Sequence, residues 1–147
     1  MAAIVIATIA LTLILYKCAT RPYIARMITQ IKFVSVPVSD QDRSLEFFTK
    51  KLGFKVATDQ AMGPGQRWIE LKIGGADTKL VLYTMPGDEH RIGKAMPLSF
   101  QCDNVQRTAD ELKAKGVEFA QDVKEEPWGT FAIIKDPDGN QFVIGSK

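Results

Sequence analysis

An indole and a carboxylate lie two residues apart in a segment that predicts a β-strand. Alternate side chains of a strand share a face, so we expect Trp68 and Glu70 on one face and the flanking isoleucine and leucine on the other. The face with the indole would offer a wall for a planar ligand and a partly desolvated acid, able to act as a base or to bind a ligand cation. Trp68 could instead be an ordinary packing residue, and Glu70 could pair with Arg67 or Lys79 on a solvated sheet face.

The chain has one histidine, His90, which lies in a polar segment. We expect a solvated loop histidine there rather than a metal ligand or a base. The sequence contains no nucleophile elbow, paired-cysteine motif or dinucleotide fingerprint, and the glycines around Pro64 are not followed by the Lys-Ser/Thr of a phosphate loop. The common signatures of nucleophilic, thiol-redox and nucleotide chemistry are therefore excluded.

The end of the chain predicts a β-hairpin. Two apolar strands, residues 130–135 and 141–144, flank a turn that reads Asp-Pro-Asp-Gly-Asn at residues 136–140. Pro137 presets φ at the first turn position, Gly139 allows positive φ, and the aspartates can bond to the turn's own backbone.

A similar hairpin ends an earlier unit, at about residues 27–86. Its first strand, about residues 28–38, alternates in hydrophobicity and precedes a helix with a cap at Ser39 or Asp40. Gly53 supplies the left-handed stop of that helix, and three further strands follow it. The unit therefore has the order β-α-β-β-β.

A second unit, about residues 96–147, repeats this order. Asn104 caps its helix and Gly116 stops it, 63 residues after Gly53. This internal duplication predicts an α+β fold of two β-α-β-β-β units, whose mixed sheets curl into a cup with the helices outside.

The composition fits one domain. The chain has 147 residues, of which 46% are hydrophobic, enough to bury a core. A net charge of +2 with both signs interspersed gives no basic stripe, which argues against nucleic acid as a partner. Cys18 and Cys102 lie in separate segments, and we expect both to stay reduced, as in a cytoplasmic protein.

An apolar, uncharged run occupies residues 2–16 and is followed by Lys17, Arg21 and Arg26. The run is shorter than the roughly 18 residues that a full membrane span needs. Three interpretations stay open: a membrane anchor with the globular part in the cytoplasm, a dispensable extension before Met27, or a cleaved signal. In each interpretation, residues 1–26 are a separate segment and residues 27–147 form a single domain. If the protein contacts a membrane, we expect only residues 1–26 to do so.

Four short motifs occur in order along that domain. They are Val36-x-Val38-Ser39-Asp40, Ser44-Leu45-x-Phe47-Phe48, Leu52-Gly53-Phe54 and Asp136-Pro137-Asp138-Gly139-Asn140. Together they resemble the vicinal oxygen chelate superfamily, which includes glyoxalase I, extradiol dioxygenases and bleomycin-resistance proteins. The resemblance implies the paired-unit fold and a homodimer, whereas activity does not follow, because such a scaffold hosts unrelated chemistries and non-catalytic binders.

Enzymes of that family hold a divalent metal in the cup with His, Glu or Gln side chains. When the family's four metal-ligand positions are matched to this sequence, three of them are occupied by Phe33, Pro97 and Val143. The fourth falls within residues 80–82, which are Leu-Val-Leu. None of these side chains can bind a metal. The resemblance therefore implies no metal, no cofactor and a non-catalytic binder. The alternative is a glyoxalase-like lyase or isomerase, or a dioxygenase, that uses Glu70 as general base or binds a metal elsewhere.

Strand alternation nominates the lining of the cup. The predicted ligand-binding residues are Phe33, Ser35, Trp68, Glu70, Ser99, Gln101, Trp128 and Val143. Segments 62–66 and 127–130 are expected to form lips at its mouth. No catalytic residue is predicted unless the domain is an enzyme, in which case it is Glu70. The predicted function is the binding of a small, partly planar organic molecule by a cytoplasmic homodimer.

Overall fold

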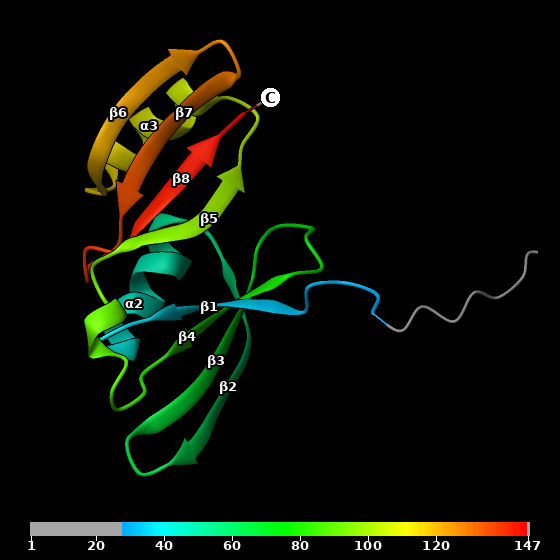
Figure 1. Ribbon diagram of the computed structural model, residues 1–147, viewed down its shortest axis with the longest axis vertical. Helices are drawn as coiled ribbons and strands as arrows, with labels where there is room; N and C mark the ends of the chain where they lie inside the picture. The colour runs from blue at the N-terminus through cyan, green and yellow to red at the C-terminus, as the bar shows by residue number, and fades with distance from the viewer. Residues whose placement is uncertain (1–27, 147) are drawn as a thin grey trace, which may run out of the picture. The chain divides into compact units, whose positions relative to one another are not determined.

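The computed structural model describes residues 28–146, in which two β-α-β-β-β units follow one another (Figure 1). The first unit comprises β1 (Phe33–Pro37), α2 (Gln41–Glu46), the π-helical turn η1 (Phe47–Lys51), β2 (Lys55–Gly63), β3 (Gln66–Lys72) and β4 (Lys79–Tyr83). A 3-10 turn η2 (Glu89–Arg91) leads to the second unit, which comprises β5 (Ala95–Gln101), α3 (Val105–Ala114), β6 (Glu118–Glu126), β7 (Gly129–Lys135) and β8 (Gln141–Gly145). The segment 1–26, for which an anchor was one interpretation, lies outside the described residues.

Each unit builds one four-stranded mixed sheet. The strand orders are β1-β4-β3-β2 and β5-β8-β7-β6. In both sheets the first and last strands of the unit are parallel neighbours, and the other pairings are antiparallel. The predicted α+β fold of two like units is therefore confirmed.

The predicted helix signals are also confirmed. The Asp40 and Asn104 side chains accept hydrogen bonds from the backbone nitrogens of Arg43 and Arg107, at 2.9 and 2.8 Å. Gly53 and Gly116 have φ of +76° and +71°, the left-handed conformation that ends a helix at low cost for glycine.

Two local features differ from the sequence prediction. Strand β1 begins at Phe33 rather than near Ile28, because its hydrogen-bonded partner β4 begins at Lys79, opposite Phe33. The segment 62–66, predicted as a lip, is only a tight turn, because β2 runs to Gly63 and pairs there with Gln66 at the start of β3.

One face of each sheet packs against the helices, and the two helix-side faces contribute to one hydrophobic core. Phe48 of the first unit lies edge-on to Phe142 of β8, with ring centroids 5.8 Å apart. The ends of the helices also meet, since Lys51 Nζ donates to the Gly116 carbonyl at 3.0 Å and Lys115 Nζ donates to the Lys51 carbonyl at 3.1 Å. The opposite face of each sheet, called here the open face, points away from its helix. Among residues 28–146, no helix is long and apolar enough to cross a membrane.

Candidate functional site

The open face of the first sheet brings together the four residues predicted from strands β1 and β3. The Phe33 ring meets Trp68 edge-on, with centroids 5.3 Å apart and an interplanar angle of 83°. Ser35 on β1 and Glu70 on β3 both pair with Val81 of β4, so the three form one row across the sheet. Val81 faces away from the helix but is fully buried, which shows that its neighbours on the open face cover it.

Glu70 is held in place by two partners. Its carboxylate forms an ion pair with Lys79 and accepts a hydrogen bond from Trp68 Nε1 at 3.0 Å. Of the two alternatives for this residue, the ion pair is therefore confirmed, with Lys79 as the partner; Arg67 instead pairs with Asp59 and Asp42. Hydrogen bonds from Lys79 and Trp68 lower the pKa of Glu70, because they stabilise the charged form more than its desolvation penalises it.

Of the other four predicted residues, three lie on the second sheet and Trp128 lies in the turn between β6 and β7. Ser99 of β5 is opposite Val143 of β8, and Gln101 follows on the same face of β5; both polar side chains are exposed. Trp128 is 71% exposed and stacks on Phe131, with ring centroids 5.0 Å apart. The eight residues thus form two groups of four, one on the first sheet and one on the second sheet together with its β6–β7 turn. Among the described residues, no hydrogen bond, ion pair or aromatic contact joins the two groups.

The residues at the family's ligand positions do not fit a divalent metal. Phe33 is packed against Trp68, and Val143 presents only carbon atoms to the strand beside it. Within residues 80–82, the two leucines belong to the core on the helix side, so Val81 is the one that faces the open side. In the part of the chain that the structure describes, no three His, Cys, Asp or Glu side chains are grouped so as to hold a metal ion.

His90 lies in the turn η2, where its side chain is exposed. Its Nδ1 atom is 2.9 Å from the carbonyl oxygen of Gly87, a local contact within the turn. The structure thus places His90 in the segment between the two units, with an exposed side chain, as predicted from the sequence.

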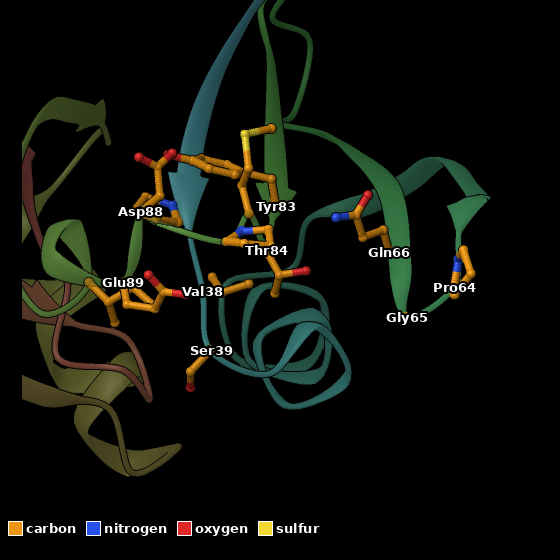
Figure 2. Close-up of a pocket in the computed structure, with 13 residues that line it drawn as sticks. Val38, Ser39, Pro64, Gly65, Gln66, Tyr83, Thr84, Asp88 and Glu89 are labelled. Atoms are coloured by element: carbon orange, nitrogen blue, oxygen red, sulfur yellow. The ribbon is translucent and has the colours of Figure 1, made fainter.

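A hollow of about 370 Å³ adjoins the open face of the first sheet (Figure 2). It lies where β1 and β4 end, and the turn between β2 and β3 and the linker before β5 border it. Tyr83 and Gln66 line it, and both lie on the open face. Tyr83 alternates with Val81 along β4, and Gln66 alternates with Trp68 along β3. The predicted lip at residues 62–66 contributes Pro64, Gly65 and Gln66 to this hollow.

Tyr83 and Asp88 also line the hollow, and neither was predicted from the sequence. Tyr83 could have been found, because it continues the alternation of Lys79 and Val81 on β4. Burial, followed by the neighbouring Asp88 carboxylate, raises the pKa of the Tyr83 phenol. Asp88 lies in the linker, whose path no periodic pattern predicts.

The comparisons with known proteins agree on one protein family. The model of the Glyoxalase/Bleomycin resistance protein/Dioxygenase superfamily matches residues 30–144. The uncharacterized protein YetH of Bacillus subtilis (strain 168) is 40% identical over 121 residues, which are 80% of this chain and 98% of YetH. A superfamily member from Sphaerobacter thermophilus DSM 20745 superposes with a TM-score of 0.74 at 26% identity, covering 83% of this chain and 100% of that one. TnmS3, an antibiotic binding protein from Streptomyces sp. CB03234, superposes with a TM-score of 0.71 at 32% identity, covering 82% and 98%.

Proposed function

The chain belongs to the glyoxalase/bleomycin resistance protein/dioxygenase superfamily, and from that premise we propose that it binds a small, partly planar organic molecule without metal-dependent turnover. The proposal rests mainly on the position of Phe33. At the first ligand position of the family's metal enzymes, this chain has a phenyl ring packed against Trp68. The similarity to TnmS3, an antibiotic binding protein, supports the same class of function.

The open face of the first sheet supplies what such a ligand needs. Phe33 and Trp68 give a half-buried aromatic surface, and the Glu70–Lys79 pair beside it gives polar groups in a fixed position. The adjoining hollow of about 370 Å³ is within the size range of small-molecule sites. Aromatic walls with a few placed polar groups are the usual composition of such sites.

The alternative, a lyase, isomerase or dioxygenase with Glu70 as general base, is less well supported. A general base works best when its pKa lies near the working pH. Lys79 and Trp68 shift the pKa of Glu70 in the opposite direction, and they occupy the oxygens that would accept a substrate proton.

We also propose that the protein is a cytoplasmic homodimer in which a second copy completes the site. Within residues 28–146 of one chain, the two groups of predicted lining residues share no bond, and Ser99 and Gln101 on the second sheet are exposed. Each sheet also has two edge strands, which a symmetric partner could cover. Cys102 is a free thiol, which fits a reducing compartment.

Nuclear magnetic resonance of the indole N–H groups tests the proposal. The Trp68 N–H donates to Glu70, so its signal is sensitive to any molecule that contacts this pair. A Trp128→Phe variant removes the other indole signal and leaves Trp68 as the reporter. Titration with a panel of planar aromatic compounds is expected to shift the Trp68 signal saturably; a panel that leaves it unmoved at millimolar concentration contradicts the proposal.

A further inference from the structure

Three lysines form a row across the open face of the first sheet. Lys55 of β2 and Lys72 of β3 are cross-strand partners. Lys72 alternates with Glu70 along β3 and therefore lies on the open face. Lys79 precedes Leu80, whose partner is Leu71, so Lys79 on β4 adjoins Lys72 from the other side.

This arrangement leaves positive charge without a counter-charge. Like charges directly opposite on neighbouring strands are destabilising. Lys55 and Lys72 are exposed, and neither forms an ion pair with any residue in the range 28–146. Lys79 is the one lysine of the row with an acidic partner, Glu70.

Other charged residues near the three lysines increase this excess of positive charge. The positive charge of Lys32 also acts on the Glu70 carboxylate and lowers its pKa. Lys79 and Lys32 thus both act on this one carboxylate, and Lys55 and Lys72 add two further positive charges to the same sheet. Asp77, in the turn before β4, forms an ion pair with none of them within the described part of the chain.

The row of lysines ends beside the aromatic pair of Phe33 and Trp68. Phe33 of β1 is the cross-strand partner of Lys79, and its ring contacts Trp68. Neighbouring strands lie about 4.8 Å apart, so a charged substituent on a fused ring could reach the lysines while the ring contacts the aromatic side chains.

We propose that this face selects planar aromatic molecules that bear an anionic group, with the ring on Phe33 and Trp68 and the anion on Lys72 and its neighbours. The inference rests on the proposed small-molecule binding at this face and adds the charge class of the ligand. It reverses the preference expected from Glu70 alone, because Lys79 already neutralises that carboxylate. An anionic group would both gain ammonium partners and relieve the repulsion between Lys55 and Lys72.

The test compares two ligands of the same shape, 2-naphthoate and the neutral 2-naphthamide, on the full chain. Affinity is measured by calorimetry, and the Trp68 indole signal reports the location of binding. We expect 2-naphthoate to bind about threefold to tenfold more tightly, and the ratio to fall as sodium chloride is raised, because exposed charges are screened.

Lys72→Gln supplies the decisive variant. It should reduce the preference for 2-naphthoate to near unity, and it should leave the melting temperature unchanged or raised because a like-charge pair is lost. Lys94→Gln, which removes one exposed lysine from the linker before β5, is the matched control and should retain the preference.

The outcomes distinguish failure of the charge selectivity from failure of the proposed small-molecule binding. Equal affinity of both ligands, with a shifted Trp68 signal, overturns the charge selectivity and leaves the proposed function standing. A preference that survives in both Lys72→Gln and Lys55→Gln also overturns the lysine assignment. If neither ligand moves the Trp68 signal at millimolar concentration, the proposed function fails together with the inference.

Discussion

Asn140 donates a hydrogen bond from Nδ2 to the carbonyl oxygen of Pro37 at 2.9 Å, across 103 residues of sequence. The same nitrogen donates to Asp136 Oδ2 at 2.8 Å, and Oδ1 accepts from the Gly93 backbone nitrogen at 2.8 Å. Asn140 is fully buried, so these bonds satisfy all of the polar groups that its side chain removes from water. The last turn of the chain is therefore a joint between the two units as well as a hairpin.

Replacement of Asn140 by alanine is predicted to destabilise the fold by about 2 to 4 kcal/mol. The substitution leaves the buried Pro37 carbonyl and the buried Asp136 Oδ2 without their donor, and each unsatisfied group costs about 1 to 3 kcal/mol. Urea unfolding measures the change. Asn104→Ala, which removes one exposed capping bond, is the control at about 1 kcal/mol; equal losses for the two variants would contradict the role of Asn140 as a joint.

Gly53→Ala is predicted to lower the free energy of unfolding by about 1 kcal/mol for conformational reasons alone. A Cβ at residue 53 would meet no atom within 4 Å, but φ is +76° there. Gly75 also has open space and lacks a positive φ, so Gly75→Ala is the matched control. Thermal unfolding of the two variants separates strain from contact, and a neutral Gly53→Ala variant would refute the left-handed stop.

Glu70→Gln is predicted to reduce stability in a pH-dependent way. The pKa of Glu70 is lowered in the folded chain, so its contribution is present above the ordinary carboxyl value near 4.5 and is lost as pH falls through the folded-state value. At pH 7 we expect a loss of about 0.5 to 1 kcal/mol, the range of a solvent-screened pair. The difference from wild type should shrink towards zero as pH falls through the lowered folded-state pKa.

Unfolding at several pH values checks this behaviour. Glu118→Gln is the control, because Glu118 is exposed and forms no ion pair within residues 28–146. A Glu70→Gln variant with a constant deficit across the pH range would mean that the lost packing, rather than the charge, matters.

Metal independence is predicted from Phe33, Pro97 and Val143, which have no donor atoms in their side chains. Elemental analysis of purified protein should find less than about one tenth of an equivalent of zinc, nickel, manganese or iron. A chelator should leave the melting temperature unchanged, because no metal-binding energy is linked to folding. Stoichiometric metal together with a chelator-induced drop would refute a metal-free binder.

Sedimentation at micromolar concentration is predicted to give about twice the chain mass of 16.3 kDa, as expected for a symmetric dimer. If a partner covers the second sheet, the backbone amides of Ser99 and Gln101 should exchange hydrogen more slowly in the dimer than in the monomer obtained by dilution. A monomer whose mass is independent of concentration would contradict the dimer.

Much of the fold could be predicted because its signals are local. Asp40 and Asn104 cap helices, and Gly53 and Gly116 end them, through bonds and φ values that involve only a few neighbouring residues. The repeat of these signals at a spacing of 63 or 64 residues was enough to predict two like units. Alternation likewise placed Trp68 and Glu70 on one face, because the side-chain period of a strand is two whatever its neighbours are.

The sequence by itself therefore determined the units, their elements and the two faces of each strand, whereas the tertiary structure decided which residues meet across strands. Glu70 had two basic candidates, and the register of β3 against β4 selected Lys79. The row of Lys55, Lys72 and Lys79 likewise comes from three strands and has no signature in the order of residues along the chain. Asn140 reads as a turn residue, and only the packing of the two units brings Pro37 to its side chain. The physical reason is that strand order and register depend on the burial of all strands together, and no short segment contains that information.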